Sequence, residues 1–190
     1  MFQSRVFKSL AAAAVLALFL GLSSLILPAA SAQGTARSAG LSDSDKAFAQ
    51  QADQINMTEA RLGRIAQTNA ENPAVKAFGR LLTDDHHQLN DGLHGLRHVV
   101  EREGVSLTRR LDQQHGEEFD HLSQLKGSAF DQAYVQAMVE GHEKAVSYFE
   151  HEGNRLQDPQ LKNWALNTLP ILQQHLALAR TIQGSLMAKR

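Results

Sequence analysis

Four polar residues occupy positions where an amphipathic helix would place a buried apolar side chain. They are Glu59, His86, His142 and His175. One carboxylate and three imidazoles inside one helical core would be costly as isolated polar groups. Together they would form a ligand set, because imidazole and carboxylate bind Zn, Fe, Cu, Mn and Ni, and the chain has no cysteine to bias the choice. The sequence therefore predicts a transition-metal site, with Zn or Fe as the leading candidates.

Each of these residues lies on the apolar seam of a different predicted helix. The helices are expected over residues 43–69, 73–103, 128–153 and 158–187. Apolar residues recur along each one at alternating spacings of three and four, as in helical bundles. The Asn72-Pro73 and Asp158-Pro159 pairs mark two of the starts. Each polar residue falls near the middle of its helix, so an antiparallel bundle would bring all four to one layer.

A connector over residues 104–127 separates the second and third predicted helices. It holds a short amphipathic segment that ends at Gly127. Ferritin-like bundles need a long crossover at this place, and no segment alternates with the period of a strand. The predicted fold is all-α: a ferritin-like four-helix bundle over residues 43–187, with a crossover connector carrying a short extra helix. Pro170 should kink or loosen the last helix just before His175.

A weak internal repeat supports two helical hairpins. Residues 72–78 resemble residues 158–164. Phe48 and Glu59 precede the first copy much as Phe130 and the His142-Glu143 pair precede the second.

Two carboxylates adjoin the seam histidines. Asp85 precedes His86 and Glu143 follows His142. Either could bind the metal or orient a histidine of a neighbouring helix through its other ring nitrogen. A di-iron centre needs about four carboxylates and two histidines, and this chain inverts that ratio, which favours a histidine-rich mononuclear site. The remaining histidines off the seams are expected to face solvent: His94, His98, His115, His121 and His151.

The first 32 residues have the pattern of a secretory signal peptide. Arg5 and Lys8 precede an apolar run over residues 10–27, and an Ala-Ser-Ala sequence predicts cleavage after Ala32. An uncleaved membrane anchor is the alternative, since the run is about long enough to span a bilayer. Residues 33–42 are small and polar and predict a disordered leader. Export without cysteine predicts a periplasmic or secreted protein.

The charge balance excludes one class of partner. The 190 residues include 19 Lys and Arg against 20 Asp and Glu, with no basic stripe, so nucleic acid is not expected. Motifs for a serine triad, a phosphate loop or a zinc protease are absent from the sequence, and no catalytic residue is assigned. Association with the envelope or outer membrane, formation of a homo-oligomer and an uncleaved anchor all stay open.

Three segments resemble the bacterial domain-of-unknown-function 4142 family. They cover residues 73–86, 129–146 and 168–179, and carry an Asp85-His86 pair, a Gly141-His142-Glu143 motif and an L-P-x-L-x-x-H motif ending at His175. The resemblance spans residues 43–187. It implies a ferritin-like fold and an exported or outer-membrane location, without an established activity. Gly141 replaces the family's usual acidic residue, which leaves Glu143 and Glu140 as substitutes.

Two functions follow from these patterns. The first is an exported protein that binds a transition metal in its bundle core, in metal handling or envelope stress protection; a redox reaction with peroxide or oxygen would need an open metal position. The second is a non-enzymatic envelope interaction or structural protein, whose polar layer fixes helix register and binds no metal.

Overall fold

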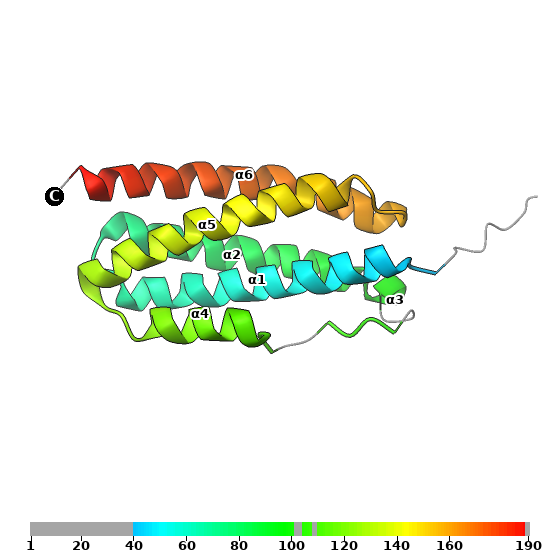
Figure 1. The fold of residues 1–190 in the computed structure, drawn as a ribbon, viewed down its shortest axis with the longest axis horizontal. Coiled ribbons are helices and arrows are strands. Elements are labelled where there is room, and N and C mark those ends of the chain that lie inside the picture. The colour runs from blue at the N-terminus through cyan, green and yellow to red at the C-terminus, as the bar shows by residue number, and fades with distance from the viewer. Residues whose placement is uncertain (1–39, 101–103, 108–109, 189–190) are drawn as a thin grey trace, which may run out of the picture. The chain divides into compact units, whose positions relative to one another are not determined.

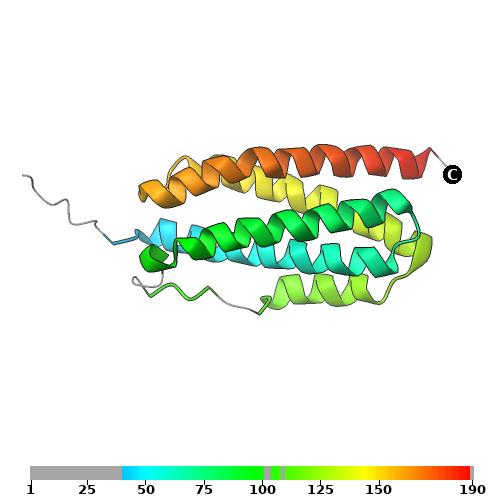
Figure 2. The ribbon, with the colours of Figure 1, turned by 180° about the vertical axis from the view of Figure 1, so that it is seen from behind.

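The computed structural model describes residues 40–100, 104–107 and 110–188, and its helices are joined by turns and loops. The helices are α1 (Asp43–Asn69), α2 (Pro73–Gly95), α3 (Arg97–Val100), α4 (Gln113–Ser123), α5 (Gly127–Gly153) and α6 (Pro159–Met187). The four long helices α1, α2, α5 and α6 run side by side, and α4 lies along the outer side of α1 (Figures 1 and 2). Since no strand occurs among the described residues, the predicted all-α bundle with a crossover is confirmed.

Side-chain caps set the starts of three of the four long helices, α1, α2 and α6. The Ser42 hydroxyl accepts the N–H of Asp45, and the Asp45 carboxylate accepts the N–H of Ser42, which forms a capping box on α1. Asn72 and Asp158 cap α2 and α6, each followed by a proline. Proline suits this position because its missing N–H would have no partner inside the helix.

The second helix is shorter than its seam predicted. It ends at Gly95, and the Leu96 N–H turns back to the Leu93 carbonyl at 3.0 Å before α3 begins. Gly92 and Gly95 lower the helix propensity of this stretch by roughly 1 kcal/mol each relative to alanine. The expected continuation over residues 101–103 lies outside the described residues. By contrast, α6 stays helical through Pro170.

Two buried polar side chains of α1 fasten the crossover connector. The Gln54 amide donates to the Arg110 carbonyl at 3.1 Å and accepts the Asp112 N–H at 2.9 Å. At the other end of α1, the Asn69 amide donates to the Ser123 carbonyl at 3.2 Å. These bonds satisfy backbone groups at both ends of α4 and hold it against α1. Sequence patterning did not reveal these bonds, because their backbone partners lie 54 to 58 residues away in the chain.

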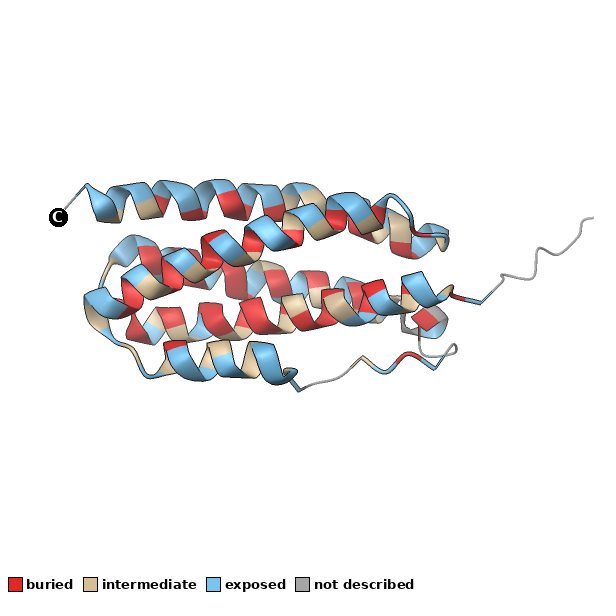
Figure 3. Ribbon diagram, viewed as in Figure 1, coloured by how far each residue is buried: buried red, intermediate tan, exposed pale blue. Residues whose placement is uncertain are grey.

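The apolar core is divided into two clusters. One gathers around Phe78, Phe130 and Tyr134, and the other around Phe48 and Phe149. Buried positions line the inward faces of the helices in both regions (Figure 3). Along each long helix, one of the four seam residues lies between members of the two clusters: Glu59, His86, His142 and His175. A buried polar layer therefore separates the two apolar halves.

The amino-terminal predictions fall mostly outside the described residues. The expected signal peptide and most of the expected leader are not covered by the structure. The end of that leader differs from the prediction: Leu41 is buried and packs in the cluster around Phe48. Its apolar side chain gains more from that contact than from solvent. Among the described helices, none is long and apolar enough to cross a membrane.

Candidate metal site

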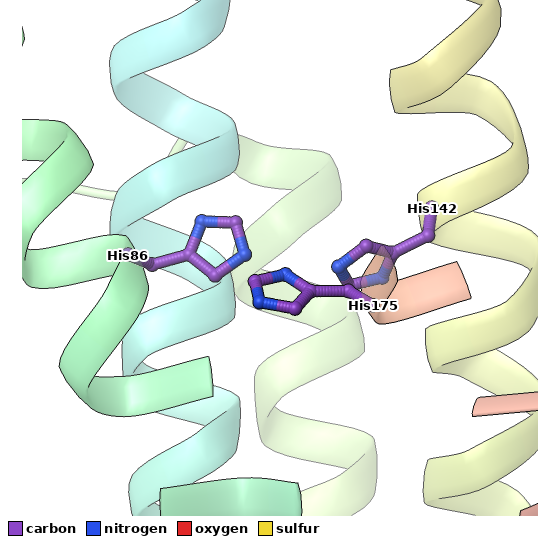
Figure 4. A group of neighbouring side chains, drawn as sticks. All are labelled: His86, His142 and His175. Atoms are coloured by element: carbon purple, nitrogen blue, oxygen red, sulfur yellow. The ribbon is translucent and has the colours of Figure 1, made fainter. Parts of the chain in front are cut away.

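Three helices each contribute one histidine to a single buried cluster. His86 comes from α2, His142 from α5 and His175 from α6, and none is more than 1% exposed. One ring nitrogen from each lies within 4.8 Å of the other two. The ring centroids are 5.3 to 5.8 Å apart. Figure 4 shows the three rings directed toward one another.

Each imidazole is also held from outside the cluster by an oxygen acceptor. The three bonds are His86 Nδ1 to Asn56 Oδ1 at 3.1 Å, His142 Nδ1 to the Met138 carbonyl at 2.9 Å, and His175 Nε2 to Asp85 Oδ2 at 2.9 Å. An oxygen acceptor places the ring proton on the bonded nitrogen. Outer partners of this kind fix the tautomer and orientation of metal-binding histidines.

The second nitrogen of each ring is left with a lone pair and no partner. His86 Nε2, His142 Nε2 and His175 Nδ1 are buried and make no hydrogen bond within the described part of the chain. An unsatisfied buried polar atom costs about 1–3 kcal/mol. Three such atoms in one cluster are what a bound metal ion would satisfy at once.

Burial keeps the cluster uncharged. It lowers the pKa of His86 well below its ordinary value, with further lowering by His142 and His175. It lowers the pKa of His142 to about 3. The pKa of His175 is also lowered by burial, although the Asp85 carboxylate acts in the opposite direction. Neutral imidazole is the form that binds metals.

The spacing of the nitrogens fits a metal after a small contraction. Three atoms no more than 4.8 Å apart lie within about 2.8 Å of a common centre, and a metal–imidazole bond is about 2.0–2.1 Å long. Each ring would move inward by less than about 1 Å.

Glu59 lies beside the cluster and faces its outer side. Its Oε1 is 3.7 Å from His142 Nδ1, the nitrogen that donates to the Met138 carbonyl. Its Oε2 is buried without a hydrogen-bond partner in the described chain. Burial, and secondarily the Glu118 carboxylate, raise the pKa of Glu59 to about 8. The structure thus places Glu59 next to the three nitrogens, against an outer face of His142.

The two adjoining carboxylates occupy different places. Asp85 reaches across to α6 and accepts the hydrogen bond from His175, so it orients a histidine of a neighbouring helix. Glu143 is exposed and pairs with Arg180 at 2.7 Å, away from the cluster. The structure therefore does not bring Glu143 to the predicted site, because one residue along a helix turns its side chain by about 100°. Glu140 is likewise exposed.

Sequence reasoning missed Asn56, the acceptor for His86. It lies one position past the seam residue Ile55 and is fully buried. The surface expectation for the other histidines holds for His98, His121 and His151, which are exposed. It is wrong for two that are half-buried: His94 bonds the buried Asp53 carboxylate at 3.0 Å, and His115 bonds Asp112 at 2.7 Å.

Solved structures share this fold at low sequence identity. The structure described as "CopM in the Cu(II)-bound form" matches with a TM-score of 0.62 and 15% identity, covering 74% of this chain and 96% of that one. A DUF305 fragment from Deinococcus radiodurans matches with a TM-score of 0.63 and 14% identity, covering 78% and 99%. Likeness at this level shows the helical-bundle fold alone. No curated protein matches the chain.

A family model confirms the resemblance seen in the three sequence segments. It matches residues 30–182, which include α1, α2 and α5, most of α6, and all three cluster histidines. The chain belongs to the family described as domain of unknown function DUF4142.

Proposed function

We propose that this protein is an exported metal-binding protein that holds one transition-metal ion between His86, His142 and His175. The observation that carries the proposal is the set of three buried ring nitrogens without partners, each opposite a nitrogen fixed by an oxygen acceptor. A core that only needed polar groups for helix register would be expected to pair them with one another.

The donor set favours copper or zinc. Imidazole suits Zn, Cu, Fe and Ni, whereas carboxylates favour harder ions, and Glu59 and Asp85 lie against outer nitrogens of the histidines. Cu²⁺ has the highest affinity of the divalent first-row ions for such sites. The fold's likeness to a protein described in a Cu(II)-bound form agrees with this choice. The sequence had favoured Zn or Fe, and the carboxylate-poor cluster moves the proposal away from Fe.

Deep burial suits binding and buffering of the ion. Metal handling or protection of the bacterial envelope would use a site that keeps the ion away from solvent reactants. The residues assigned here bind and orient, and none is assigned to a reaction. The histidines would have to be neutral to bind, which is the state that burial imposes.

The direct test is metal analysis of the mature protein purified without a histidine tag. One equivalent of copper or zinc should bind after reconstitution, and His142→Ala should lose most of the affinity. Substoichiometric metal together with unchanged affinity in His142→Ala would refute the proposal.

A thermal measurement separates this function from a metal-free polar layer. An ion bound only to the folded state raises its stability by mass action, by about 2.7 kcal/mol at 100 times Kd. Addition of Cu²⁺ or Zn²⁺ should therefore raise the Tm by several degrees, and a chelator should reverse the rise. A Tm that responds to neither would favour the register role.

A further inference from the structure

A groove on the surface leads to the back of the histidine cluster. It has a volume of about 580 Å³ and lies between α1, α4 and α5. Its charged and titratable lining residues are mostly acidic: Glu59, Asp112, His115, Glu118, Glu140, Lys144 and Tyr148. Even without Glu59, whose raised pKa keeps it mostly protonated near neutral pH, three carboxylates against one lysine would raise the local concentration of cations in the groove.

Glu59 connects this groove with the cluster. Its side chain is 9% exposed and lines the groove, while its Oε1 lies 3.7 Å from His142 Nδ1. Its Oε2 is buried and has no hydrogen-bond partner among the described residues. An oxygen of the Glu59 carboxyl group thus lies without a partner at the inner end of the groove.

Gly141 leaves the space in which this carboxylate lies. A Cβ atom at position 141 would sit 3.3 Å from Glu59 Oε1. Gly141 also lines the groove, so a larger residue there would narrow the passage at the carboxylate.

A second groove, between α2 and α6, differs in character. It has a volume of about 680 Å³ and reaches Asp85, whose Oδ2 is already bonded to His175. Asp85 is its one charged lining residue, and its polar lining is otherwise mainly the amides of Gln88, Gln160, Asn163, Asn167 and Gln174. It therefore offers a cation less electrostatic attraction than the acidic groove.

We propose that the groove between α1, α4 and α5 is the access route for the metal ion, and that Glu59 is the carboxylate that passes the ion to the histidines. This inference rests on the proposed function, because it needs a metal that binds the cluster. It adds the path and the transfer residue, which the cluster alone does not identify.

The experiment measures the rate of Cu²⁺ uptake. Cu²⁺ is mixed with metal-free protein in a stopped-flow instrument, and quenching of the single tryptophan, Trp164, reports binding. The test variant is Glu118→Gln/Glu140→Gln, which removes two charges from the groove. The matched control is Glu143→Gln/Glu150→Gln, which removes the same charge from exposed positions of α5 outside the groove.

The groove variant should bind Cu²⁺ about tenfold more slowly at low ionic strength, with the difference shrinking as salt is added. The control should stay within about twofold of the wild type. Glu59→Gln, checked for folding by circular dichroism, should slow uptake at both low and high salt, because it removes the transfer ligand and not only the attraction.

The outcomes separate the two proposals. If the wild type takes up Cu²⁺ and both double variants have the same uptake rate, the access route is overturned while the metal site stands. If Glu59→Gln takes up Cu²⁺ at the wild-type rate, the transfer role of Glu59 is overturned. A wild type that takes up no Cu²⁺ would overturn the proposed function itself.

Discussion

The two hairpins, α1–α2 and α5–α6, have equivalent residues at their helix starts and loops but different residues at the middle of their helices. They align at one constant sequence separation, which pairs Asp45 with Asp131, Asn72 with Asp158, Pro73 with Pro159 and Phe78 with Trp164. The separation also pairs Asn56 with His142. This differs from the sequence-based alignment, which placed Glu59 opposite His142, because the contacts of the two loops fix the register.

Each hairpin uses an aspartate at the start of its first helix to clasp the loop of the other. Asp131 accepts the N–H groups of Glu71 and Asn72, at 3.1 and 2.8 Å. Asp45 accepts those of Gln157 and Asp158, at 2.9 and 3.3 Å. The reciprocal bonds make the halves equivalent at their ends.

The middle sections of the two hairpins differ. At equivalent positions the first hairpin carries the amide Asn56 and the second the imidazole His142, and the amide bonds the ring of His86. The helix contacts differ as well: Gly63 and Gly79 pack backbone to backbone in the first hairpin, where the second has Phe149 and Ala165. At this one pair of equivalent positions, α5 therefore carries a candidate ligand where α1 carries an orienting residue, although the first hairpin also supplies the ligand His86 from α2.

The largest difference between the halves should appear in metal affinity. His142→Ala removes one of three ligands and should weaken binding by at least about 100-fold, whereas Asn56→Ala removes an outer partner and should cost about 10- to 100-fold. Competition against a chromophoric chelator measures both. Equal losses in the two variants would mean that His142 and Asn56 do not differ as ligand and orienting residue.

In the metal-free protein, His142 and Asn56 should also differ in their effect on how stability changes with pH. The three histidines have pKa values in the folded protein below the ordinary 6.5. Their contribution to the free energy of unfolding is therefore fully present above pH 6.5. It is lost as the pH falls toward the folded pKa values, about 3 for His142. Glu59 acts in the opposite sense, because its pKa in the folded protein, about 8, exceeds the ordinary value of 4.5. Its contribution to the free energy of unfolding is present below pH 4.5 and is lost as the pH rises through 8.

The stability lost by protonating three imidazoles should exceed the stability gained by protonating one carboxylate. The Tm should therefore fall as the pH is lowered from 6.5 to 4.5. His142→Gln should flatten this slope, and Asn56→Ala should lower the Tm without flattening it. Scanning calorimetry across pH measures both. An unchanged slope in His142→Gln would contradict a neutral imidazole at position 142.

The glycine contact should make the first hairpin less tolerant of a methyl group. In Gly79→Ala the new Cβ would lie 2.5 Å from the Ala66 Cβ and 2.7 Å from the Gly63 carbonyl oxygen. We expect a loss of about 1–3 kcal/mol in unfolding free energy, despite alanine's higher helix propensity. The reverse change in the second hairpin, Ala165→Gly, should cost about 1 kcal/mol. Urea unfolding compares them, and a stabilised Gly79→Ala would contradict the close approach.

Loss of the hydrogen bonds from Asp45 and Asp131 to the loops should have the smallest effect on the free energy of unfolding. Asparagine has one acceptor oxygen in its side chain, so Asp131→Asn should leave one loop N–H unpaired and cost about 1 kcal/mol. Asp45→Asn should cost more, because Asp45 also accepts the N–H of Ser42 in the capping box. The same urea measurements test this order, and a larger loss in Asp131→Asn would reverse it.

Local patterns in the sequence were enough to locate the helices and the buried histidines. Heptad spacing placed His86, His142 and His175 on inward faces, and the Asn72-Pro73 and Asp158-Pro159 pairs marked two helix starts that the structure reproduces. These features are local, since a seam or a cap depends on residues within a few turns. The length of α2 was overestimated because two glycines outweighed an apolar seam.

The hydrogen-bond partners that complete the site follow from contacts between helices. It assigned Asn56 to His86, Asp85 to His175 and the Met138 carbonyl to His142, and it left Glu143 at the surface. These pairings depend on helix rotation and on contacts between helices far apart in the chain. A rotation of one residue, about 100°, separates a core position from a surface one, and spacing within a single helix does not fix which neighbour a side chain meets.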